Sequence, residues 1–136
     1  MFVCIGNACR SPMAEAIARQ EAADVMEISS AGLMPMGYVP QMTLQTLTRN
    51  GYSIDGLDSK PIDSKVLTEM DLVINLSGYE RERALASAAT IEHWPVDDPY
   101  GEDAAIYQKI LEEIRRRVND LAERLRKEQI REKVKE

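Results

Sequence analysis

The sequence predicts one α/β domain in which a doubly wound, four-stranded parallel sheet carries helices on both faces. Three observations predict this fold. The chain has 136 residues, enough for one hydrophobic core and too few for two. Short apolar runs alternate along it with segments of helical spacing, and the first apolar run leads through a glycine-containing loop directly into such a segment. Strands that alternate with helices form right-handed crossovers and therefore a parallel sheet covered on both sides.

The first half of the chain supplies two strands and two helices. Its expected elements are a strand over 1–3, a helix over 13–22, a strand over 25–30, an ordered loop over 34–41 and a helix over 42–49. Ser11 suits the cap before the first helix, and Pro12 suits its first turn. Asn50 and Gly51 form a stop signal for the second helix.

The second half supplies the other two strands and ends in the clearest element. Its expected elements are a short helix over 62–70, a buried strand over 72–76, a helix over 79–89, a strand over 91–96 and an amphipathic helix over 104–127. Apolar residues recur in the last helix at steps of three and four: Ile106, Ile110, Ile114, Val118, Leu121 and Leu125. Residues 128–136 have only Ile130 and Val134 as apolar members, so we expect a domain over 1–127 and a charged, frayed tail over 128–136.

Composition excludes several classes of function. A formal net charge of -6 is unlike that of a general nucleic-acid binder, which needs clustered Lys and Arg. Apolar stretches are far shorter than the roughly 20 residues of a membrane span, and no secretory leader is visible. The only two cysteines lie five positions apart, too close to act as a framework disulfide, which favours a reducing cytoplasm. We therefore expect a cytoplasmic protein with no nucleic-acid or membrane partner, as a monomer or weak dimer.

The stretch from Cys4 to Pro12, called the anion loop below, is the first candidate site. It follows a strand and opens a helix, so backbone N–H groups can converge on one tetrahedral oxyanion at the positive end of the helix dipole. Gly6 permits a turn that a Cβ would obstruct, and the fork of Arg10 can bind two oxygens of the same anion. The same field favours the thiolate form of Cys4, which is the nucleophilic form.

The anion loop resembles the low-molecular-weight protein tyrosine phosphatases and their structural relatives, the thioredoxin-coupled arsenate reductases. Their shared signature is Cys-x5-Arg-Ser/Thr near the N-terminus, and the matching residues are Cys4, Gly6, Asn7, Cys9, Arg10, Ser11 and Pro12. A second family motif, an Asp-Pro that carries the general acid, corresponds to Asp98-Pro99, followed by Tyr100. Phosphate leaving a tyrosine oxygen creates a phenolate, so a positioned acid would ease its departure.

The resemblance implies a role for each of these residues. Cys4 attacks phosphorus, Asp98 acts as general acid and then general base, and Arg10 binds the equatorial oxygens together with the loop backbone. The loop residues that would contact the anion are Ile5, Gly6, Asn7, Ala8, Cys9 and Ser11. Asn7 would brace the loop, and Ser11 would donate a hydrogen bond to the Cys4 sulfur. Cys9 would either pack in the loop or form a reversible disulfide that protects Cys4 from over-oxidation. No metal or other cofactor is implied.

The sequence departs from the family in the walls of the site. Family phosphatases usually have two tyrosines after the Asp-Pro, and here Gly101 follows Tyr100. Their bulky wall residue after the second strand corresponds to Met36, with Tyr38 nearby. Tyr38 and Tyr100 are thus expected to line the substrate cleft or simply to pack. Relatives usually begin a few residues earlier, which leaves open whether the native chain begins before Met1.

The leading hypothesis is a phosphomonoester hydrolase acting on a phosphorylated protein or a small aryl phosphate through a phosphocysteine. The second hypothesis is an arsenate reductase, because Glu92-His93-Trp94 before the Asp-Pro is similar to that branch. A self-contained reductase passes a disulfide to further cysteines, and this chain has none beyond Cys9, so the reductant would have to be an external thiol. The third hypothesis is a non-catalytic phosphate-binding module.

Overall fold

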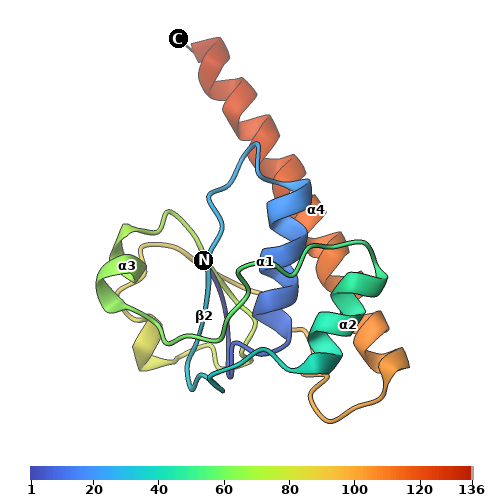
Figure 1. Ribbon diagram of the computed structural model, residues 1–136. Helices are drawn as coiled ribbons and strands as arrows, with labels where there is room; N and C mark the ends of the chain where they lie inside the picture. The colour runs from blue at the N-terminus through green and yellow to red at the C-terminus, as the bar shows by residue number, and fades with distance from the viewer. Residues whose placement is uncertain (136) are drawn as a thin grey trace.

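The computed structural model describes residues 1–135 and contains one parallel sheet with the strand order β2-β1-β3-β4 (Figure 1). The strands are short: β1 (Phe2–Cys4), β2 (Ser30–Gly32), β3 (Val73–Asn75) and β4 (Ile91–His93). Cys4 pairs with Gly32 on one side of β1, and Val3 pairs with Asn75 on the other. The winding therefore reverses at β1, and a doubly wound sheet binds its ligands beyond the strand ends at such a reversal.

Side chains of each strand alternate between two cores. Phe2 and Cys4 face one core, which is packed by α1 (Arg10–Glu21) and α4 (Ala104–Lys135). Val3 faces the other, smaller core together with Leu67 and Leu85. In Figure 1, α1, α2 (Gln41–Arg49) and α4 lie on one side of the sheet, and α3 (Ser64–Glu69) lies on the other. The predicted α/β fold with helices on both faces is confirmed.

Two of the predicted elements are wrong. The strand expected over 25–30 is Ser30–Gly32 instead, because β1 pairs only from Phe2 onward and its first partner is Ser30. The helix expected over 79–89 is reduced to a single 3₁₀ turn, Arg83–Leu85. Only Leu85 is buried in that segment, so no apolar stripe holds a longer helix against the sheet.

The first helix also starts differently from the expectation. It begins at Arg10, and its N-cap residue is Cys9, which provides no side-chain cap. Ser11, the expected cap, lies inside the first turn because its hydroxyl group is bonded to other residues of the anion loop. The helix start is thereby part of the candidate site rather than an independently capped end.

The last helix, α4, differs from the expectation at both ends. Ile106 is 36% exposed, and the neighbouring Tyr107 takes the buried position instead at 2%. The helix continues through Lys135, past the expected end at residue 127, so residues 128–135 are helical where fraying was expected. Residues 128–135 are mostly Glu, Gln, Lys and Arg, which have high helix propensity. The preceding turn is stabilised by the i,i+4 ion pair of Glu123 with Lys127. Both effects favour a helix that has no tertiary contacts. None of the described helices combines the length and apolarity needed to cross a bilayer.

Candidate active site

The anion loop lies directly beyond the carboxyl end of β1, where the winding of the sheet reverses. Cys4, the last residue of β1, is 2% exposed, and Arg10, the first residue of α1, is 4% exposed. None of the backbone N–H groups from Ile5 to Cys9 donates a hydrogen bond to another described residue. These donors lie at the N-terminus of a helix, which makes the loop suited to bind an anion.

Two neighbouring segments hold the outer side of the loop. The Met34 N–H donates to the Ile5 carbonyl at 2.8 Å, and the Met36 N–H donates to the Gly6 carbonyl at 2.9 Å. The Ser59 hydroxyl donates to the same Gly6 carbonyl at 2.8 Å. The loop carbonyls are thus turned outward to these partners, which leaves the opposite, N–H side free for a ligand.

Gly32 permits the close approach of the loop to β2. A Cβ atom at residue 32 would lie 2.8 Å from the Asn7 nitrogen and 2.9 Å from the Ile5 oxygen. Both are backbone atoms, which cannot move aside as a flexible side chain can. A side chain at this position would therefore push the loop away from the sheet.

Asn7 forms the centre of a buried hydrogen-bond network behind the loop. Its backbone has φ 47, the only positive value outside glycine among the described residues, and its side chain is fully buried. The Asn7 Oδ1 atom accepts from the Lys60 N–H at 3.0 Å. The Asn7 Nδ2 group donates to Ser11 Oγ at 2.8 Å and to Ser30 Oγ at 3.0 Å. Each polar atom of this side chain is therefore satisfied.

This network determines the direction of the hydrogen bond to Cys4. The Lys60 N–H donates to one atom of the Asn7 amide, which identifies that atom as the acceptor Oδ1. The other atom is therefore the donor Nδ2, and Ser11 Oγ accepts a hydrogen bond from it. The remaining Ser11 hydroxyl proton then points to Cys4 Sγ, which lies 2.9 Å away. The Cys4 sulfur is therefore the acceptor of this hydrogen bond.

Glu15 lies at the other end of the same network. Its side chain is buried, with 1% of the residue exposed, and it accepts a hydrogen bond from the Ser30 hydroxyl group. It also forms an ion pair with Arg19, which lies one helical turn further along α1. The Lys60 ammonium is 3.9 Å from its Oε1 atom. Two cations thus compensate the buried carboxylate, while Lys60 contacts both Glu15 and Asn7.

The Arg10 guanidinium group is fixed on one side only. Its Nη1 group donates to the Leu76 carbonyl at 2.7 Å and to the Val96 carbonyl at 3.0 Å. Its Nε atom is buried and has no hydrogen-bond partner among the described residues. A buried N–H left unpaired on a cation is costly unless an acceptor binds there. The Nε and Nη2 edge of Arg10 is therefore available to an oxyanion.

Asp98 meets Arg10 at the mouth of the loop. The Asp98 Oδ2 atom lies 3.6 Å from Arg10 Nη2, and its side chain is 46% exposed. Its Oδ1 atom accepts from the Tyr100 N–H at 3.1 Å, which fixes the orientation of the carboxylate. The structure thus brings Asp98 to Arg10 although 87 residues separate them in sequence. Tyr100 itself is 55% exposed.

Cys9 and Tyr107 form a buried pair below the loop. The Cys9 sulfur lies 3.5 Å from the Tyr107 hydroxyl. Burial raises the pKa of the Cys9 thiol above its ordinary value, against the smaller effects of hydrogen bonds from Thr43 and Tyr107. Burial, followed by the bond to Cys9, likewise raises the pKa of Tyr107. Both groups are neutral at pH 7, and both described cysteines are free thiols.

Comparison with known proteins identifies the family. The sequence model described as "low molecular weight phosphotyrosine protein phosphatase" matches residues 1–131. The chain belongs to this family. Among its curated relatives, an arsenate reductase of Bacillus subtilis is 34% identical over 130 residues, which cover 90% of this chain and 93% of the relative. Arsenate reductase 1 of Bacillus cereus is 32% identical over 124 residues, with 90% and 92% covered.

Solved structures of the phosphotyrosine phosphatase family include both reductases and phosphatases. A phosphate-bound arsenate reductase is 27% identical with a TM-score of 0.79 and covers 92% of this chain and 96% of its own. The low molecular weight tyrosine phosphatase of T. tengcongensis is 30% identical with a TM-score of 0.80, at 90% and 96% coverage. The YwlE arginine phosphatase is 26% identical with a TM-score of 0.82, at 93% and 94% coverage.

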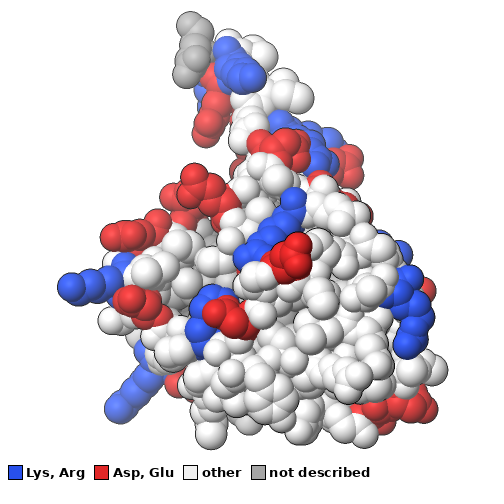
Figure 2. Space-filling model, viewed as in Figure 1, with Lys and Arg blue, Asp and Glu red and all other residues white. Residues whose placement is uncertain are grey.

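For this member of the family, the structure places the sequence-predicted residues in two groups. One group, together at the mouth or behind the loop, consists of Cys4, Ile5, Gly6, Asn7, Ala8, Cys9, Arg10, Ser11 and Asp98. Tyr38 and Tyr100 form the other group, exposed on segments that border the loop, at 60% and 55%. Tyr38 closely follows Met34 and Met36, whose N–H groups donate to carbonyl groups of the anion loop. It belongs to residues 28–48, which include no charged side chain and form part of the white area low in Figure 2.

The residues that sequence reasoning missed lie outside the anion loop, and all but Glu15 come from distant parts of the chain. They are Glu15, Ser30, Thr43, Ser59, Lys60, Leu76, Val96 and Tyr107. Seven of these eight residues make their contact through a backbone atom or a hydroxyl group, which gives no sequence signal by itself. No three His, Cys, Asp or Glu side chains of the described residues gather as a metal site.

Proposed function

We propose that this protein is a cysteine-dependent phosphomonoester hydrolase that removes phosphate from a phosphorylated protein or a small aryl phosphate in the cytoplasm. The observation that carries the proposal is Arg10, a buried guanidinium group at the end of the anion loop whose Nε atom has no hydrogen-bond partner among the described residues. It supplies charge where a phosphate dianion would meet the loop amides.

In the first step, the Cys4 thiolate attacks phosphorus, so an S–P bond forms as the bond from phosphorus to the leaving oxygen breaks. Asp98, held at the mouth through Tyr100 N–H and Arg10, donates its proton to that oxygen. In the second step, Asp98 takes a proton from water, which attacks phosphorus and releases phosphate and the Cys4 thiolate. Arg10 and the loop N–H groups hold the equatorial oxygens throughout.

An arsenate reductase that uses an external thiol is the second candidate. The curated relatives named arsenate reductase favour it, since arsenate has the shape and charge of phosphate. The cysteine count opposes a self-contained relay. The chain has two cysteines, both within the anion loop.

One preparation of the protein separates the two candidates. We expect metal-free hydrolysis of para-nitrophenyl phosphate, abolished by Cys4→Ser and retained by Cys9→Ser, which is a matched change in the same loop. Arsenate reduction should be negligible with glutathione or with a thioredoxin system. If Cys4→Ser keeps its hydrolytic activity, the mechanism is wrong. If arsenate reduction with an external thiol far exceeds hydrolysis, the second candidate replaces the first.

A further inference from the structure

The chain that follows β4 is attached to the anion loop on both sides of a short acidic segment. Before this segment, the Val96 carbonyl accepts a hydrogen bond from Arg10 Nη1 at 3.0 Å. After it, the Tyr107 hydroxyl group lies 3.5 Å from the Cys9 sulfur. Residues 97–103, called the acidic segment below, lie between these two attachments and therefore border the mouth of the loop.

The acidic segment carries four carboxylates and no Lys or Arg. The Asp98 carboxylate lies 3.6 Å from Arg10 Nη2. Asp97, Glu102 and Asp103 are exposed, and none of the ion pairs among the described residues involves them. Figure 2 shows acidic side chains low on the right, beside the white area, where Figure 1 shows the start of α4 in orange. Three negative charges that no described cation compensates thus lie beside the mouth.

The other segments at the mouth do not offset this charge. Residues 33–41 hold the outer side of the loop and include no charged side chain. Residues 77–82 follow Leu76, whose carbonyl accepts from Arg10 Nη1 at 2.7 Å, and they carry one arginine between two glutamates. Lys60, behind the loop, forms ion pairs with two carboxylates. The rim of the mouth is therefore negative overall.

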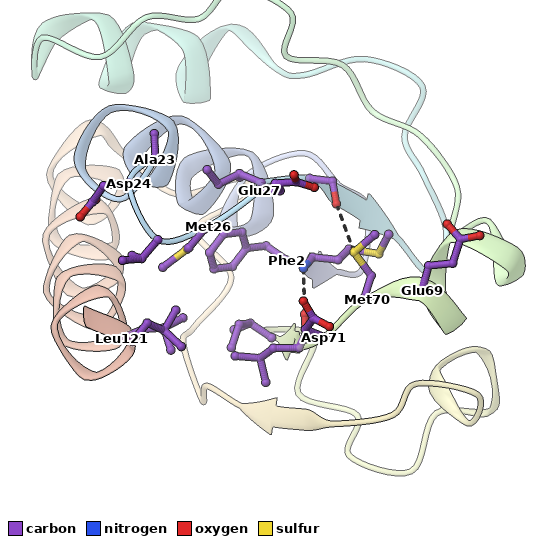
Figure 3. A pocket seen from close by; sticks show the side chains of 16 residues that line it. Phe2, Ala23, Asp24, Met26, Glu27, Glu69, Met70, Asp71 and Leu121 are labelled. Atoms are coloured by element: carbon purple, nitrogen blue, oxygen red, sulfur yellow. Dashed lines mark hydrogen bonds between the residues drawn. The ribbon is translucent and has the colours of Figure 1, made fainter. Parts of the chain in front are cut away.

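A groove of about 670 Å³ lies at the amino ends of the strands, on the opposite edge of the sheet from the anion loop (Figure 3). Phe2, Met26 and Met70, which Figure 3 labels, are among the residues that line it. The described residues that line the groove include none from the anion loop or from the three segments at its mouth. When a phosphorylated residue enters the anion loop, its neighbours in the bound chain therefore meet the rim of the mouth and not this groove.

The floor and the rim of the site have opposite charges. Arg10 is 4% exposed, and its Nε atom lacks a hydrogen-bond partner among the described residues, which indicates an anionic ligand at the floor. In an extended chain, the neighbours of a bound residue lie about 3.3 Å further away for each position. Two neighbours on each side thus stay within the Debye length of about 8 Å at physiological salt. The acidic segment attracts Lys or Arg at these positions and repels Asp or Glu.

We propose that the substrate is a phosphorylated protein segment in which Lys or Arg lies within about two residues of the phosphorylated residue. This inference rests on the proposed hydrolase function and names its substrate class. Arg10 and the loop N–H groups hold the phosphate, and the carboxylates of Asp97, Glu102 and Asp103 hold the basic neighbours. The same carboxylates disfavour segments whose neighbouring residues are acidic, because the rim has no surplus of positive charge to bind them.

Two phosphotyrosine peptides of equal length test this proposal. One carries Lys at the two positions on each side of the phosphotyrosine, and the other carries Glu at the same positions. We expect kcat/KM of the native protein to be at least about tenfold higher for the Lys peptide at low salt, since several exposed charge pairs of about twofold each act together. The ratio should approach one in about 1 M salt, where the Debye length is about 3 Å. Para-nitrophenyl phosphate, which has no flanking residues, measures hydrolysis itself.

Two double substitutions with the same change of net charge locate the origin of the preference. Asp97→Asn with Glu102→Gln neutralises half of the acidic segment and keeps the general acid, so the ratio of the two kcat/KM values should fall at least about threefold. Glu69→Gln with Asp71→Asn neutralises two exposed carboxylates that line the groove of Figure 3, and the ratio should stay at its native value. Circular dichroism checks that each variant is folded.

The results separate this inference from the function on which it rests. If the native protein does not hydrolyse para-nitrophenyl phosphate, the proposed function is wrong. If it hydrolyses that compound but does not favour the Lys peptide over the Glu peptide, the function stands and the substrate class is wrong. The inference is also overturned if the variant of the acidic segment keeps the native ratio, or if the groove variant loses it.

Discussion

Replacing Asn7 by alanine should destabilise the fold by an amount that the structure allows us to estimate. The side chain makes three buried hydrogen bonds, to Ser11, Ser30 and the backbone of Lys60. At about 1 kcal/mol each, their loss lowers the free energy of unfolding by about 3 kcal/mol. An alanine at φ 47 adds about 1 kcal/mol, because the left-handed region is unfavourable for a residue with a Cβ and without a local hydrogen bond.

Urea unfolding followed by circular dichroism measures this effect. We expect a loss of about 4 kcal/mol for Asn7→Ala and about 3 kcal/mol for Asn7→Gly, since glycine tolerates the backbone conformation but makes none of the bonds. Phosphate in the buffer should stabilise the native protein more than either variant, because the loop amides are no longer held in place. Stabilities of both variants within about 0.5 kcal/mol of the native protein would refute the view that this network supports the loop.

Three further predictions concern other parts of the molecule. Gly32→Ala should lower the free energy of unfolding by about 1–3 kcal/mol and weaken the binding of phosphate, because the added Cβ meets the loop backbone. Calorimetry measures the phosphate affinity, and an unchanged affinity would contradict this prediction. Burial raises the pKa of Cys9, so iodoacetamide should modify Cys9 in a Cys4→Ser background more slowly than a free thiol at pH 8, and fast modification would contradict it. The hydrogen bond from Arg126 lowers the pKa of Asp24, so the ion pair of these two residues stabilises the fold above pH about 4. This stabilisation is lost as the pH falls and Asp24 becomes protonated. The substitution Asp24→Asn should therefore lower Tm at pH 7 and leave it unchanged near pH 2.

Local sequence signals predicted the parts of the fold that depend on neighbours in the chain. The run from Cys4 to Pro12 contains a strand end, a tight turn and a helix start, and the structure forms all three there. The helix of residues 41–49 ends at the expected Asn50. The position of β2 was wrong by several residues because it depends on pairing with β1, which no local pattern in residues 25–30 records.

The candidate site was predictable only where one segment holds several of its residues. Cys4, Asn7 and Arg10 could be proposed as site residues because they share a loop, and Asp98 because its Asp-Pro motif resembles that of the family; the structure places these four side chains near one another. Lys60 could not be found, since it reaches Asn7 through its backbone N–H across 53 positions of sequence. The interior position of Tyr107 depends on the rotation of α4 against the sheet, which apolar spacing defines only to within one residue.

Trapping of a phosphorylated Cys4 tests the proposed mechanism most directly. The Asp98→Ala variant should accept phosphate from para-nitrophenyl phosphate, whose good leaving group needs little acid, and should then hydrolyse the intermediate slowly for want of a base. Rapid quenching and peptide mass spectrometry should find one phosphoryl group on the peptide that contains Cys4. Turnover with the phosphoryl group on another residue, or with none on Cys4 at any time, would contradict the mechanism.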